Sequence, residues 1–84
     1  MELTRAQRDV LVIARMGRLY VYTEGGFWFD SNSGIVALPQ DRATAALRLL
    51  ADGGLEADEP EAGSAPVEIT EAGMALLAAW TVRP

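Results

Sequence analysis

The side chains able to take part in chemistry are carboxylates, guanidiniums and hydroxyls, because the 84-residue chain contains no histidine, cysteine or lysine. This excludes disulfides, thiol chemistry, zinc sites with the usual ligands and catalysis by imidazole. A carboxylate pair could act in acid/base catalysis, but the acids cluster in a loop with glycine and proline, at Glu56, Asp58, Glu59 and Glu61. Neither pair of adjacent glycines precedes the Gly-Lys-Ser/Thr sequence of a phosphate loop. The sequence therefore predicts a protein that is not an enzyme and needs no cofactor or metal.

Arginine supplies all seven basic residues and is unevenly distributed. Residues 1–22 hold four arginines and two acids, whereas residues 23–84 hold three arginines and ten acids. The formal net charge of −5 disfavours nucleic acid as the main partner, because neutralising phosphates supplies most of the sequence-independent affinity for DNA. If DNA is nevertheless bound, the predicted contacts are Arg15, Arg18, Arg42, Thr44 and Arg48.

Five of the six aromatic residues lie between positions 20 and 29, in a segment with the pattern of strands. Strands are predicted at residues 19–23 and 27–30, because the two adjacent glycines between them supply the positive φ values of a tight hairpin turn. A second turn at residues 31–34 leads into a further apolar run at 35–38. The segment is therefore expected to be a hairpin or a three-stranded meander.

Both faces of this ribbon are expected to be apolar or aromatic. Tyr20 and Tyr22 share one face, while Phe27 and Phe29 lie opposite Trp28 on the second strand. Two interpretations remain: either helices cover both faces, or one face is left for a partner or a second copy of the chain. In the second case the predicted protein interface consists of Tyr22, Phe27, Trp28 and Phe29.

Three helices are expected to position these side chains. Thr4 is the predicted N-cap of the first and Gly17 its end, and the arginines of this helix face outward as a solvated surface or a binding stripe. The second begins near Pro39 and ends at the glycine pair 53–54. Its core-facing residues, by helical spacing, are predicted to be Ala43, Ala46, Leu47 and Leu50.

The segment from residue 42 to residue 80 resembles the second half of a winged-helix domain. There a recognition helix leads into a two-stranded wing, and a final helix opens with a Thr-x-x-Gly turn, which Thr70 and Gly73 match. Thr70 is the predicted N-cap of that helix, and Gly73 would permit close backbone approach to a neighbouring element. The resemblance implies a single α+β domain over residues 1–84. Its expected parts are three helices, the aromatic hairpin or meander after the first, and a two-stranded acidic wing.

Length and hydropathy place the chain among small cytoplasmic proteins. A domain of 84 residues buries only about 60–65% of its unfolded surface, so self-association as a homodimer is an open alternative. No apolar run approaches the roughly 18 residues of a membrane span, and the first residues lack the pattern of a signal peptide. The abundance of alanine, glycine and arginine is typical of high-GC bacteria and their phages. We therefore expect no membrane partner, and no small-molecule ligand is evident.

Two features of this sequence differ from those of DNA-binding winged-helix domains. The wing loop carries acids where that family offers lysine or arginine to phosphate, and an aromatic hairpin replaces the helix before the recognition helix. The favoured function is therefore a protein-interaction module on a winged-helix-like scaffold, in a small phage or bacterial regulator that binds a host or partner protein. The alternative is a winged-helix transcriptional regulator that binds DNA as a dimer.

Overall fold

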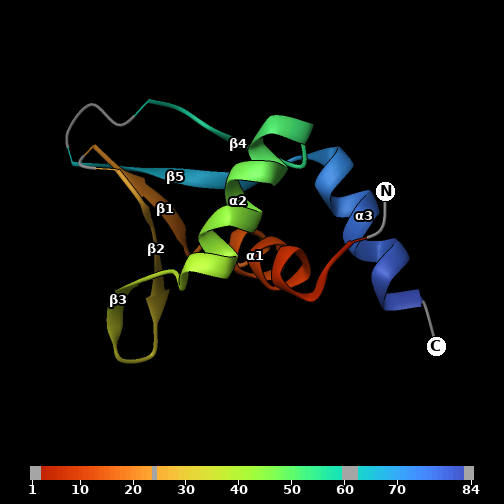
Figure 1. Ribbon diagram of the computed structural model, residues 1–84, viewed down its shortest axis with the longest axis horizontal. Helices are drawn as coiled ribbons and strands as arrows, with labels where there is room; N and C mark the ends of the chain where they lie inside the picture. Colours follow the sequence, from red (N-terminus) through yellow and green to blue (C-terminus); the bar gives the residue numbers. More distant parts are fainter. Residues whose placement is uncertain (1–2, 24, 60–62, 83–84) are drawn as a thin grey trace.

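The computed structural model describes residues 3–23, 25–59 and 63–82. Over these residues the chain forms three helices and one five-stranded antiparallel sheet, which confirms the predicted α+β class (Figure 1). The helices are α1 (Arg5–Arg15), α2 (Gln40–Asp52) and α3 (Glu71–Val82). The strands are β1 (Leu19–Tyr22), β2 (Phe27–Ser31), β3 (Gly34–Ala37), β4 (Leu55–Ala57) and β5 (Ser64–Ile69). The predicted turn residue Glu24 and the acid Glu61 lie outside the described residues.

Helix α1 begins as predicted at Thr4. The Gln7 backbone N–H donates to Thr4 Oγ1 at 3.1 Å, and the Thr4 N–H donates to Gln7 Oε1 at 2.9 Å, which completes a capping box. The helix ends at Met16, and Gly17 follows with a φ of 72°. The meander is also confirmed, because β2 pairs with both β1 and β3.

The sheet joins two segments that are far apart in the sequence. Its strand order is β3-β2-β1-β5-β4, so the meander and the β4–β5 hairpin share one sheet through the β1–β5 pair. In that pair Tyr20 lies opposite Pro66 and Val21 lies opposite Ala65. The local pattern of neither hairpin predicts this pairing, because it joins strands more than forty residues apart in the sequence.

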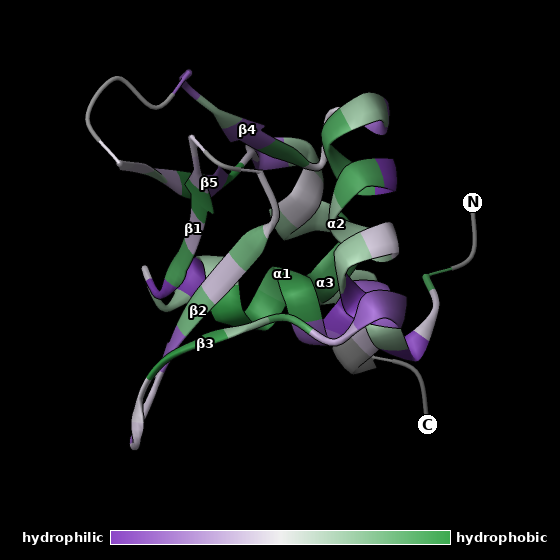
Figure 2. Cartoon of the chain, turned by 60° about the vertical axis from the view of Figure 1, so that its left-hand side comes forward, coloured by the Kyte–Doolittle hydropathy of each residue, from purple (hydrophilic) through white to green (hydrophobic). Residues whose placement is uncertain are grey.

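The core lies between the sheet and the helices, which gather on one side of it (Figures 1 and 2). The hydropathy colouring of Figure 2 is hydrophobic along much of α1 and α2, the two helices that pack on each other. All three helices and two strands contribute its largest fully buried side chains, Val10, Leu11, Leu19, Leu49, Val67 and Leu77.

The predicted core face of α2 was partly wrong. Leu47 is 61% exposed, whereas Leu49 is fully buried beside Ala45 and Ala46. Ala46 is buried and Ala43 and Leu50 pack partly buried against the core as predicted, so the helix is rotated only as far as is needed to turn Leu47 outward and Leu49 inward. This rotation turns Arg42 toward α1 instead of outward, because Arg42 lies about one turn before Ala45 and Ala46 on the same face.

The end of α2 and the start of α3 meet in a tight junction of backbone. Thr70 donates from its N–H to the Gly54 carbonyl at 3.2 Å and from its hydroxyl to the Gly53 carbonyl at 2.5 Å. The Gly73 N–H in turn donates to Thr70 Oγ1 at 3.0 Å, which confirms Thr70 as the helix cap. A Cβ on Gly73 would collide with the Gly54 carbonyl oxygen, so the close approach expected at Gly73 is confirmed.

We predict that Gly73→Ala destabilises the protein. Alanine is about 1 kcal/mol better than glycine inside a helix, so a site with free space would gain stability from this change. The collision with Gly54 reverses that sign, and overpacking of this kind costs about 1–3 kcal/mol. Urea denaturation followed by circular dichroism gives the free energy of unfolding, and an increase for the alanine variant would contradict the junction.

A second pair of variants tests the orientation of α2. Leu49→Ala removes a fully buried side chain and should lower the free energy of unfolding by about 2–5 kcal/mol. Leu47→Ala, two residues away on the same helix, removes an exposed side chain and should change it by less than about 0.5 kcal/mol. Thermal and urea unfolding of both proteins measure this difference, and a larger loss for Leu47→Ala than for Leu49→Ala would show that the helix is oriented as its sequence periodicity predicted.

Candidate functional site

The residues predicted to contact DNA do not form one surface. Arg15 and Arg18 are exposed at the end of α1 and just before β1. On α2, Arg42 Nη2 lies 2.9 Å from Asp9 Oδ2, and Arg48 Nε lies 3.5 Å from an Asp52 carboxylate oxygen.

Thr44, the fifth predicted DNA contact, is likewise satisfied within its own helix. Its hydroxyl donates to the Gln40 carbonyl at 3.0 Å. The polar residues of α2 that were expected to read DNA therefore all have partners in the same chain, and its two arginines are each ion-paired with a carboxylate.

The predicted protein interface is divided between the two faces of the sheet. Phe27 is buried on the face covered by the helices, and Phe29 packs against the core from the same face. Tyr22 and Trp28 lie on the opposite face, half-buried. This corrects the expectation of one surface formed by all four residues, because alternate side chains of a strand point to opposite faces.

The face away from the helices is called the outer face here and is centred on Tyr20, Tyr22, Trp28 and Pro66. Strand pairing places Trp28 opposite Tyr20, and Tyr20 opposite Pro66, so the three lie in a row across β2, β1 and β5. The rings of Tyr22 and Trp28 pack at a centroid distance of 5.5 Å with a tilt of 49°. The helices lie on the other side of the sheet (Figure 1), and each of these rings keeps part of its surface exposed.

An acidic hollow adjoins the outer face at β4 and β5. It has a volume of about 300 Å³ and is lined by Glu56, Ala57, Asp58, Pro66 and Glu68. Glu56 lies directly opposite Glu68 in the β4–β5 pair, and both are exposed. Like charges in directly opposed positions repel each other, so a cation bound between them would be stabilising. Pro66 links the hollow to the aromatic row.

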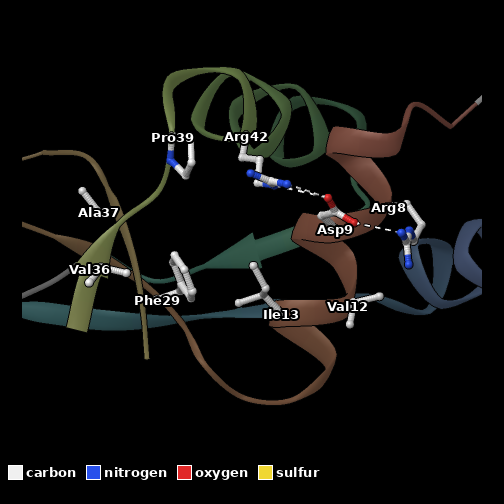
Figure 3. Close-up of a pocket in the computed structure, with 9 residues that line it drawn as sticks. All are labelled: Arg8, Asp9, Val12, Ile13, Phe29, Val36, Ala37, Pro39 and Arg42. Carbon is white, nitrogen blue, oxygen red and sulfur yellow. Dashed lines mark hydrogen bonds and ion pairs between the residues drawn. The ribbon is translucent and has the colours of Figure 1, made fainter. Parts of the chain in front are cut away.

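A second site, the groove, lies on the helix side of the sheet (Figure 3). It has a volume of about 540 Å³ and lies among α1, β2, β3 and the start of α2. Its apolar lining comes from Val12, Ile13, Phe29, Val36, Ala37 and Pro39. Figure 3 shows the ion-paired side chains of Arg42, Asp9 and Arg8 along one end of this lining.

One carboxylate serves two guanidiniums at that end. Asp9 Oδ2 accepts from Arg42 Nε at 3.3 Å and from Arg42 Nη2 at 2.9 Å, while Asp9 Oδ1 lies 3.1 Å from Arg8 Nη2. The Arg8 guanidinium carbon lies 6.0 Å from the centre of the Trp80 ring, within cation–π range. The sequence does not predict the groove, because its lining comes from segments that only the fold brings together. Of the residues that line the groove, Phe29 and Arg42 were among the predicted site residues.

The described residues contain no group of three or more carboxylates that could hold a metal ion. Of the helices in that part of the chain, none is long and apolar enough to cross a membrane. No family model, no curated protein and no solved structure matches the chain.

We predict that two neighbouring aromatic residues respond differently to truncation. Phe27→Ala should lower the free energy of unfolding by about 3–5 kcal/mol, because it leaves a cavity in the core. Trp28→Ala should retain the fold and lose mainly its pairing with Tyr22, worth about 0.5–1.5 kcal/mol. Denaturation curves give both values, and unfolding of the Trp28 variant would mean that the outer face is part of the core.

Proposed function

We propose that this protein is a non-enzymatic interaction module on a winged-helix-like scaffold, which binds a partner protein through the outer face of its sheet. The observation that carries the proposal is one-sided coverage: the helices pack on one face, and an aromatic row lies on the other. Partly exposed tyrosine and tryptophan are enriched where proteins meet, since they offer large apolar surfaces and a polar atom. Small domains rarely expose such a surface without using it.

The winged-helix-like part of the proposal is supported by the order of elements. Helix α2 leads into the β4–β5 hairpin, and α3 follows with the Thr-x-x-Gly turn at Thr70 and Gly73. Strand β1 extends that hairpin on its β5 side. In this arrangement the wing is acidic on the outer face, at Glu56 and Glu68, and so suits a cationic protein surface better than a phosphate backbone.

The partner's chemistry follows from the outer face and the acidic hollow together. Large apolar or aromatic side chains would pack on Trp28 and Tyr20, while an arginine or lysine would enter the hollow between Glu56 and Glu68. A second copy of the chain is a poorer fit, because its own outer face carries the same acids. We therefore place a basic segment of another protein on this surface. The proposed role is that of a small bacterial or phage regulator that binds this partner.

The DNA-binding alternative has less support. Its residues on α2 are ion-paired or hydrogen-bonded to groups of the same chain, which leaves Arg15 and Arg18 as the exposed members of the predicted set without an ion pair in the described residues. Arg42 is turned toward Asp9 on α1, away from the exposed face of α2 that carries Arg48. The interaction module is consequently the function that the geometry supports best.

Selection of a random peptide library displayed on phage tests this proposal. We expect the selected peptides to combine an aromatic or large aliphatic residue with arginine or lysine a few positions away. Their synthetic copies should bind wild-type protein at least about tenfold more tightly than Trp28→Ala, because hot-spot aromatics carry about 2 kcal/mol or more. Leu47→Ala, which removes an exposed apolar side chain on α2, away from the outer face, is the control and should bind as wild type does.

Two further measurements separate the alternatives. Peptides that bind Trp28→Ala and wild type equally would remove the outer face from the proposal. Random-sequence duplex DNA should not bind at low or moderate salt; binding that weakens steeply with salt and is lost in Arg42→Gln would favour the DNA regulator instead. The protein's mass in solution reports self-association, and a dimer broken by Trp28→Ala would assign the outer face to a second copy.

A further inference from the structure

The groove carries an excess of positive charge next to an apolar lining. Arg8 and Arg42 share the single carboxylate of Asp9, so the three side chains together keep one positive charge. Both oxygens of Asp9 are already occupied, which leaves it little capacity to bind a cation. An incoming anion therefore meets a net cationic end of the groove.

Part of the hydrogen-bonding capacity of the two guanidiniums is unused. Arg8 Nε is buried and has no partner among the described residues, and over the same residues Arg42 Nη1 makes no hydrogen bond. Arginine presents five N–H donors in a planar fork that matches a carboxylate. Each side chain keeps 36% of its surface exposed, so a ligand in the groove reaches their exposed N–H groups and not the buried Arg8 Nε.

The rest of the lining is apolar and comes from α1, β2, β3 and the residue before α2. Val12 and Ile13 come from α1, Phe29 and Val36 from two neighbouring strands, and Pro39 from the residue before α2. A volume of about 540 Å³ lies within the range of about 300–1,000 Å³ typical of small-molecule sites. An apolar cleft with a few charged donors at one end fixes the orientation of a ligand that has an apolar body and an anionic head.

We propose that the groove binds a small amphiphilic carboxylate, of the size of a medium-chain fatty acid. Its chain lies over Ile13, Phe29 and Val36, and its carboxylate accepts hydrogen bonds from Arg42 and Arg8 without displacing Asp9. Strand β2 lies between the two sites, because Phe29 faces the groove and the adjacent Trp28 faces outward. The groove is therefore separate from the surface proposed for a protein partner.

Titration of the ¹⁵N-labelled protein with octanoate, followed by heteronuclear NMR, tests this site. We expect saturable shifts at the amides of Val12, Ile13, Phe29 and Val36, with a dissociation constant of about 1 mM or tighter. Acetate, which has the charge without the chain, and 1-octanol, which has the chain without the charge, should each bind at least about tenfold more weakly, because both halves of the ligand contribute.

Two matched pairs of variants assign the binding to these residues. Arg42→Gln should weaken octanoate binding by about tenfold or more, whereas Arg48→Gln, on the same helix but outside the groove, should not change it. Because Arg42→Gln also removes an ion pair, Val36→Asp provides a second test. It adds a negative charge to the groove at an exposed edge-strand position and should also weaken octanoate binding. Ile35→Asp, its neighbour on the opposite face of β3, is the control.

The proposal is overturned if octanoate shifts the amides no more than acetate does, or if Arg48→Gln and Ile35→Asp weaken binding as much as their partners do. Shifts confined to Tyr20, Tyr22 and Trp28 would also overturn it, since they would place the ligand on the outer face. Trp28→Ala should leave octanoate binding unchanged. Trp28→Ala therefore separates the two proposals, because it should weaken peptide binding and leave octanoate binding unchanged. Failure of one proposal does not imply failure of the other.

Discussion

The pairing of β1 with β5 is the constraint on which the rest of the structure depends. It joins an N-terminal meander to a C-terminal hairpin across more than forty residues of sequence, and it gives β1 a neighbour on each side. A small sheet is stable on its own only if it has three or more strands with an apolar face, or packs against a helix. Here α1, α2 and α3 pack on one face of the sheet. The Tyr20–Pro66 register also decides which side chains face outward, because a slip by one residue would exchange the two faces.

The junction of Gly54, Thr70 and Gly73 is the second tie between distant segments. It fastens the end of α2 to the start of α3 at the base of the β4–β5 hairpin, through hydrogen bonds that run between backbone and the Thr70 hydroxyl. Only a residue without a side chain fits at Gly73. The Thr-x-x-Gly pattern therefore has a structural reason in this chain that is independent of any partner, and it leaves the function to the surfaces.

The two proposed sites share strand β2 and carry opposite charge. Trp28 and Phe29 are adjacent in β2, yet one belongs to the acidic outer face and the other to the cationic groove. The orientation of α2 explains the second of these, because it places Arg42 against Asp9, which also pairs with Arg8. The same orientation removes Arg42 from the surface that a recognition helix would present. Charge is thus distributed by helix orientation as much as by composition.

The sequence by itself determined the local features of this protein. The cap at Thr4, the helix stop at Gly53, the glycine turn of the meander and the cap at Thr70 each depend on hydrogen bonds or φ values within a few residues, so short patterns predict them. The tertiary structure alone decided the strand order, the uncovered face, the burial of Leu49 in place of Leu47, and the groove. These depend on contacts between segments far apart in the chain. Helical spacing restricts a helix to one apolar arc but does not fix its centre, and strand alternation defines two faces without naming the one that helices cover.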